Sequence, residues 1–110
     1  MLTSCVEGQT TYKDISKQDL TKVLKGDNIQ LVDVRTPREY EQGFIKGAIL
    51  IDFWSEGFLS KVTQKFDKSK PIYLYCKVGG RSSKAAKILV DNGFKTVYSL
   101  DGGYTDWIKE

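Results

Sequence analysis

Short apolar runs alternate along this chain with segments in which apolar residues recur every three or four positions. The run at 71–75 is apolar at both alternating sets of positions, which is typical of a strand covered on both faces. Similar runs predict further strands at 11–15, 29–34, 48–51 and 96–100.

Helical spacing predicts five helices, at 16–25, 36–43, within 55–66, at 82–92 and at 104–109. Ser16 suits the N-cap of the first helix, Pro37 suits the first turn of the second, and Gly93 ends the fourth. In the last helix we expect Trp107 and Ile108 to face inward. Alternating strands and helices predict an α/β fold with a parallel sheet, whose chemistry lies beyond the carboxyl ends of its strands.

Length and composition indicate a single domain. The chain has 110 residues, of which 40% are hydrophobic and 28% are charged, close to the average of globular proteins. We assign the domain to 11–110 and expect residues 1–10 to form a disordered lead-in. The net charge is only +3 with the basic residues spread out, so we expect no nucleic-acid partner. No apolar stretch is long enough to span a bilayer, and we expect a cytoplasmic monomer.

The chain contains no histidine. This excludes a Ser-His-Asp triad, a Cys-His dyad and histidine-based metal sites. The two cysteines, Cys5 and Cys76, are too few for a zinc site, and a disulfide between them is not favoured because it would tie the lead-in to a loop. We therefore expect neither a metal nor a cofactor.

Cys5 has an alternative interpretation. Residues 2–5, Leu-Thr-Ser-Cys, resemble the lipobox that precedes the lipidated cysteine of bacterial lipoproteins, although the charged and apolar regions of a signal peptide are absent from the chain. A periplasmic or membrane-anchored lipoprotein and a chance match both remain open. The upstream sequence of the gene would decide between them.

Cys76 directly follows the strand at 71–75 and precedes a helix. The segment 76–82, Cys-Lys-Val-Gly-Gly-Arg-Ser, can fold as an anion nest, because its two glycines accept backbone angles that turn several N–H groups inward. The helix dipole and the charges of Lys77 and Arg81 would favour a thiolate, the reactive form of cysteine, and would attract an anionic substrate.

A cysteine after a strand is more often a small buried hydrophobic residue than a nucleophile. The adjoining glycines, the arginine five residues on and the helix behind them favour the nucleophile, and no such cluster surrounds Cys5. We therefore expect the sulfur of Cys76 to be charged and exposed at the top of the sheet, held by the amides that follow it.

The segment Cys-x-x-x-x-Arg-Ser at 76–82 resembles the active loop of single-domain rhodaneses. Three other segments agree with that family in the same order: Leu-Val-Asp-Val-Arg at 31–35 followed by Glu39, Gly-Phe-Ile-Lys-Gly-Ala at 43–48, and Leu-x-Gly-Gly-x-x-x-Trp at 100–107. The resemblance covers about 11–110. Each motif is short, but four of them in one order are specific.

The resemblance implies a rhodanese-like α/β domain with a central, mainly parallel five-stranded sheet and helices on both faces. It also implies a thiosulfate sulfurtransferase, in which a cysteine takes a sulfur atom from an anionic donor such as thiosulfate and becomes a persulfide. The sulfur would then pass to cyanide or to a thiol, including a protein thiol. The catalytic residue would be Cys76. The residues that hold the donor and the persulfide would be Lys77, Val78, Gly79, Gly80, Arg81 and Ser82.

The family segment that follows the second strand is expected to support the site without taking part in the chemistry. Asp33 and Arg35 would form a structural ion pair or turn anchor, and Glu39 would be their partner or a surface residue.

Two positions depart from the family pattern. Phe44 stands where histidine is usual, and Leu50 stands where asparagine is common. Sulfur transfer through a persulfide needs no obligate histidine base, so the expected mechanism does not depend on residue 44.

Two other functions are weighed against this one. A cysteine-dependent phosphatase also uses a Cys-to-Arg loop, but with five residues between the two, whereas Cys76 and Arg81 enclose four, which suits one sulfur better than a phosphate. Tyr75 also stands where phosphatases commonly have histidine. The second alternative is non-enzymatic: a persulfide carrier for a protein partner, or a rhodanese-like binding module. Many such modules lack the cysteine that this chain has.

Overall fold

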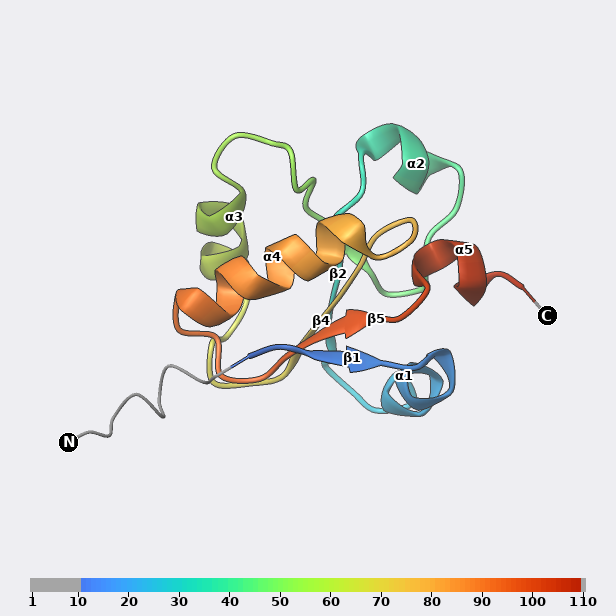
Figure 1. The fold of residues 1–110 in the computed structure, drawn as a ribbon, viewed down its shortest axis with the longest axis horizontal. Coiled ribbons are helices and arrows are strands. Elements are labelled where there is room, and N and C mark those ends of the chain that lie inside the picture. Colours follow the sequence, from blue (N-terminus) through green and yellow to red (C-terminus); the bar gives the residue numbers. More distant parts are fainter. Residues whose placement is uncertain (1–10, 110) are drawn as a thin grey trace.

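The strand predicted from the run at 71–75 lies at the centre of a five-stranded parallel sheet (Figure 1). The computed structural model describes residues 11–109, so the expectations for the lead-in and for Cys5 lie outside the described residues. The elements follow one another as β1 (Lys13–Ile15), α1 (Lys17–Val23), β2 (Gln30–Asp33), α2 (Pro37–Glu41), β3 (Ile49–Leu50), α3 (Phe58–Lys65), β4 (Ile72–Tyr75), α4 (Gly80–Asp91), β5 (Val97–Leu100) and α5 (Gly103–Trp107). The predicted α/β architecture is confirmed.

The strand order β1-β5-β4-β2-β3 gives β4 a neighbour on each side, and all four of its residues are buried. Ile72 and Leu74 belong to one apolar cluster, which includes residues of α3 and α4, whereas Tyr73 and Tyr75 belong to a second cluster with Leu20 of α1. Successive side chains of a strand point to opposite faces, so the run at 71–75 had to be apolar throughout.

Local side-chain hydrogen bonds fix where the first two helices begin. The Ser16 hydroxyl accepts from the Asp19 amide at 3.0 Å at the start of α1. At the start of α2, the Thr36 hydroxyl accepts from the Glu39 amide while the Glu39 carboxylate accepts from the Thr36 amide, which forms a capping box. The capping box holds the Glu39 carboxylate at the N-terminal end of α2.

Two sequence expectations about helices are wrong. The helix expected to begin at Ser82 begins two residues earlier, at Gly80, because the backbone turns into the helix at Gly79, whose φ is +138°. The expected inward orientation of Ile108 is also wrong: α5 ends at Trp107, and Ile108 is 61% exposed. Among residues 11–109, no helix combines the length and the apolar character needed to cross a membrane.

Candidate active site

The carboxyl ends of β2 and β4 lie side by side, because the two strands are parallel neighbours in the sheet. Asp33 is in register with Tyr75, and the Val34 amide donates to the Tyr75 carbonyl at 2.9 Å. Cys76 comes next along the chain. The structure thereby brings two of the motifs that the sequence analysis singled out, at 31–35 and 76–82, to one edge of the sheet.

Two backbone amides point at the sulfur of Cys76. The N–H of Gly79 donates to Sγ at 3.1 Å and the N–H of Ser82 donates to it at 3.3 Å. In the neutral thiol, Sγ donates to the Ser82 hydroxyl oxygen at 3.5 Å. The two amide donors stabilise a negative charge on sulfur more than they stabilise a neutral thiol. Of the predicted inward-pointing amides of the loop, that of Gly79 donates to the sulfur, and the amide of Ser82 joins it.

The expected exposure of Cys76 is wrong, because the residue is only 1% exposed. It packs within the apolar cluster that also contains Leu74 and Ala85. The sulfur is therefore both buried and hydrogen-bonded, so a reagent must present a narrow tip to reach it.

Gly79 makes the sharp turn between strand and helix. Its φ of +138° lies in the region that favours glycine, and a side chain there would meet open space, so the constraint comes from the backbone alone. The turn places Gly79 immediately before α4, whose 12 residues direct the positive end of the helix dipole toward the loop.

Arg81 is held from two sides in the first turn of α4. Its Nη1 and Nη2 donate to Glu39 Oε1 at 2.8 Å and Oε2 at 3.0 Å, and its guanidinium lies 4.8 Å from the centre of the Trp54 ring. The Arg81 hydrogen bonds, together with those from Thr36, lower the pKa of Glu39 to about 2 against the opposing effect of its burial. The charge of Arg81 is thus paired, whereas the sequence analysis expected it to stand at the rim as a second cation for the donor.

Asp33 and Arg35 form the structural ion pair that the sequence analysis expected. Arg35 Nη2 donates to Asp33 Oδ2 at 2.7 Å and to the Gly43 carbonyl at 2.7 Å, and the two side chains are 4% and 0% exposed. The Arg35 guanidinium also lies 4.3 Å from the centre of the Tyr104 ring. Of the two roles expected for Glu39, partner of this pair or surface residue, the first is wrong: the capping box of α2 holds its carboxylate where Arg81 reaches it.

The sequence profile of the rhodanese-like domain matches residues 16–110. The chain belongs to the rhodanese-like domain family. It is 38% identical over 96 residues to the thiosulfate sulfurtransferase GlpE of Coxiella burnetii, with 87% of each chain covered. The protein of the same name from Shewanella oneidensis is 32% identical over 98 residues, covering 89% of this chain and 94% of that one.

A solved structure agrees with these relatives. The crystal structure of a rhodanese-like domain protein from Staphylococcus aureus has a TM-score of 0.76 to this chain at 33% sequence identity, covering 89% of this chain and 93% of that one. The family and the fold predicted from the four motifs are therefore confirmed.

The closing helix α5 binds the loop at 76–82 of this rhodanese-like domain, which is called the active loop here after the family segment that it resembles. The amides of Tyr104 and Thr105 donate to the carbonyls of Cys76 at 2.8 Å and Lys77 at 3.0 Å. A side chain at Gly103 could not fit, because a Cβ there would lie 2.8 Å from the Cys76 oxygen and 2.6 Å from the carbonyl carbon of Lys77. This close approach explains the glycine that opens α5.

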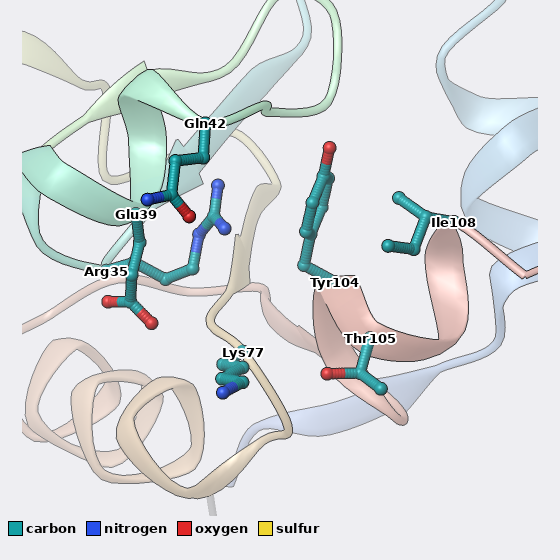
Figure 2. Close-up of a pocket in the computed structure, with 7 residues that line it drawn as sticks. All are labelled: Arg35, Glu39, Gln42, Lys77, Tyr104, Thr105 and Ile108. Atoms are coloured by element: carbon teal, nitrogen blue, oxygen red, sulfur yellow. The ribbon is translucent and has the colours of Figure 1, made fainter.

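A pocket of about 320 Å³ lies beside the loop, between α2 and α5 (Figure 2). Glu39 of α2 and Gln42, which directly follows that helix, border it on one side, Tyr104 and Thr105 border it from α5, and Lys77 reaches it from the active loop (Figure 2). The remaining lining residues are Arg35 and Ile108. Lys77 forms no ion pair with any residue of 11–109, so it is the cation of the active loop whose charge is not paired.

Phe44 and Leu50, the two residues that depart from the family pattern, take no part in the hydrogen bonds around the Cys76 sulfur. The Phe44 ring stacks on the Tyr40 ring with centroids 4.0 Å apart, and Phe44 is 45% exposed. Leu50 ends the edge strand β3. Neither contributes a hydrogen bond to the Cys76 sulfur.

Sequence reasoning missed two residues that contact the loop. Trp54 packs against Arg81, and Ser99 on β5 bonds to the hydroxyl of Ser82. The signal for Ser99 was a polar residue between Tyr98 and Leu100 in the predicted strand at 96–100, in a sheet expected to have helices on both faces. Nothing in the local sequence around Trp54 distinguished it from an ordinary loop residue.

Replacing Glu39 with glutamine should destabilise the protein by about 1 kcal/mol at neutral pH, a value moderated by solvent at this partly exposed rim. Because the pKa of Glu39 is lowered from 4.5 to about 2, the stabilisation is present above pH 4.5 and is lost as the pH falls toward 2. Urea unfolding from pH 7 to pH 2 should show the difference between wild type and Glu39→Gln closing over that window. Glu41→Gln, on the same helix, is the control, and an equal and pH-independent loss in both variants would contradict the role of the pair.

Replacing Gly103 with alanine should lower the free energy of unfolding by more than the strain of a positive φ alone explains. Gly57 has a similar φ, +76° against +62°, but a side chain there would meet nothing within 4 Å. We expect Gly57→Ala to lower the free energy of unfolding by about 1 to 2 kcal/mol, and Gly103→Ala to lower it by about 3 kcal/mol or more because the active loop must move. Equal losses in urea unfolding would show that the contact between α5 and the loop is not tight.

Proposed function

We propose that this protein is a sulfurtransferase that takes a sulfur atom from an anionic donor such as thiosulfate, carries it as a persulfide on Cys76, and delivers it to cyanide or to a thiol. The proposal rests on one observation above all: the Gly79 and Ser82 amides donate to the Cys76 sulfur at the N-terminus of α4. Membership of the rhodanese-like family and the names of the GlpE relatives support it.

In the first step, the Cys76 thiolate attacks the outer sulfur of thiosulfate. A new S–S bond forms, the S–S bond of thiosulfate breaks, and its electron pair leaves with sulfite. The negative charge moves from Sγ to the outer sulfur of the persulfide, one bond farther from the Gly79 and Ser82 amides. The N–H groups of the active loop and the α4 dipole are already oriented before the reaction, so they stabilise this charge without reorganising.

Burial of Cys76 and the position of Lys77 favour a small anionic donor. Only 1% of Cys76 is exposed, and thiosulfate presents its reactive sulfur as a single atom at the end of the molecule. Arg81 is neutralised by Glu39, so Lys77 supplies the net positive charge of the loop beside the pocket of about 320 Å³. Lys77 is therefore the side chain that we assign to attracting the sulfonate end of the donor.

In the second step, cyanide or an acceptor thiolate attacks the outer sulfur of the persulfide. That sulfur stands one bond farther out than Sγ, so an acceptor can reach it although Cys76 itself is buried. The S–S bond breaks and Cys76 regains its thiolate. The two half-reactions share one site, which predicts ping-pong kinetics.

Incubation of the reduced protein with thiosulfate should add one sulfur atom to Cys76, because the loop amides stabilise the anion on both sides of the transfer. Peptide mass spectrometry locates the added sulfur, and a Cys5→Ala background excludes loading at the other cysteine. Cys76→Ser in that background should gain none. A folded, reduced wild-type protein that gains no sulfur at Cys76 would rule out the proposed function.

Removing the charge of Lys77 should weaken donor use more than sulfur delivery. We expect Lys77→Ala to raise the KM for thiosulfate about threefold to tenfold with little change in kcat, the effect of one screened charge on an anion at close range. Lys95→Ala is the matched control, since Lys95 is exposed and precedes the amino end of β5, whereas Lys77 follows the carboxyl end of the parallel strand β4. Equal KM values for thiosulfate in the two variants would remove Lys77 from the donor site.

A further inference from the structure

Ser99 is a buried hydroxyl in the middle of a hydrophobic sheet. It lies on β5 and is 1% exposed, and on the neighbouring strand β4 it is in register with the buried Leu74. Within residues 11–109, the one hydrogen bond of its side chain is with Ser82 Oγ, at 2.8 Å. Burying a hydroxyl without a partner is costly, so this placement links Ser99 to Ser82.

Ser82 connects Ser99 to the Cys76 sulfur. Its hydroxyl oxygen lies 2.8 Å from Ser99 Oγ, 3.2 Å from the Gly79 carbonyl oxygen and 3.5 Å from Cys76 Sγ. A hydroxyl has one proton to donate and two lone pairs with which to accept. The single proton of Ser82 must therefore choose among three neighbours.

Ser82 Oγ donates to the Gly79 carbonyl at 3.2 Å, but this carbonyl keeps two shorter hydrogen bonds when the Ser82 proton turns to the sulfur. These two come from the Ser83 amide at 3.0 Å and from the Ser83 hydroxyl at 2.7 Å, and they match the two lone pairs of the carbonyl oxygen. The choice then lies between Ser99 and the sulfur. If Ser99 donates to Ser82, the Ser82 proton is directed to the sulfur.

We propose that Ser99 is a positioning residue for sulfur delivery, which donates its proton to Ser82 so that Ser82 donates to the Cys76 sulfur as that sulfur becomes an anion. The inference rests on the proposed function and concerns its second step. Cyanide carbon forms a bond to the outer sulfur, the S–S bond breaks, its electron pair stays on Cys76 Sγ, and thiocyanate leaves. The inner sulfur, Cys76 Sγ, is neutral in the persulfide and carries a negative charge after the S–S bond is cleaved.

The direction of the two hydrogen bonds matters because their strength changes during that step. A hydrogen bond to Sγ is stronger once the sulfur carries charge, so the chain from Ser99 through Ser82 lowers the barrier to cleavage. Each hydroxyl in a chain also polarises the next, so the bond from Ser82 is stronger when Ser99 donates to it. A better-stabilised thiolate leaves faster.

The test measures delivery alone. Persulfide is first formed on Cys76 with inorganic polysulfide, excess sulfur is removed, and thiocyanate release is followed in a single turnover with cyanide. We expect Ser99→Ala to slow release about threefold to tenfold, the size of one hydrogen bond. Threonine and valine have the same shape, but only threonine has a hydroxyl. Ser99→Thr should therefore retain most of the wild-type rate of release, while Ser99→Val is slowed like Ser99→Ala.

A double-mutant cycle separates positioning from loss of packing. If Ser99 acts through Ser82, Ser99→Ala should have no further effect on release in a Ser82→Ala background. Equal rates in Ser99→Thr and Ser99→Val, or additive effects in the cycle, would overturn the inference.

The outcomes also distinguish this inference from the proposed function. Wild type that is loaded by polysulfide but not by thiosulfate contradicts thiosulfate as the donor and leaves the Ser99 result valid. If neither polysulfide nor thiosulfate adds sulfur to Cys76 of the wild-type protein, both this inference and the proposed function are overturned. Should Ser99→Ala fail to fold, the comparison of Thr with Val decides the question by itself.

Discussion

The hydrogen bonds from Gly79 and Ser82 to the Cys76 sulfur depend on a passage of only four residues between β4 and α4. So short a turn requires a left-handed residue, which Gly79 supplies. It also leaves the Cys76 and Lys77 carbonyls in need of partners, and the first amides of α5 meet that need. Backbone amides of α5 thus hold the start of the loop, and the Gly79 and Ser82 amides point at the sulfur before any substrate arrives.

The two arginines around this loop each form an ion pair with a carboxylate, and the two pairs differ in how deeply they are buried. The Asp33–Arg35 pair is buried, and Arg35 also binds the Gly43 carbonyl and stacks on Tyr104, so its charge is fully compensated. The Glu39–Arg81 pair is only partly buried and joins α2 to α4 across the loop. With both arginines neutralised, attraction of an anion falls to backbone amides, the α4 dipole and Lys77. Backbone donors cannot move away from the sulfur as a long side chain can.

Most of the fold could be predicted because its signals are local. The run at 71–75 is apolar on both faces, and the capping residues Ser16 and Thr36 stand where helices begin. The start of α4 was misplaced because the two glycines of the loop indicate a turn in sequence, yet Gly80 already lies in the first turn of the helix. Ile108 was misplaced because helical spacing cannot show that α5 ends one residue earlier.

The sequence by itself determined the family, the glycines that turn the loop, and the cysteine that we propose as the nucleophile, because these lie within segments of a few residues whose chemistry is local. Only the tertiary structure decided that Cys76 is buried, that Arg81 is paired with Glu39, and that Ser99 reaches Ser82. Arg81 and Glu39 are 42 positions apart, and Ser82 and Ser99 are 17 apart. Contacts of that separation are set by which strands become neighbours in the sheet and how the helices pack on it, and no short stretch of sequence contains that information.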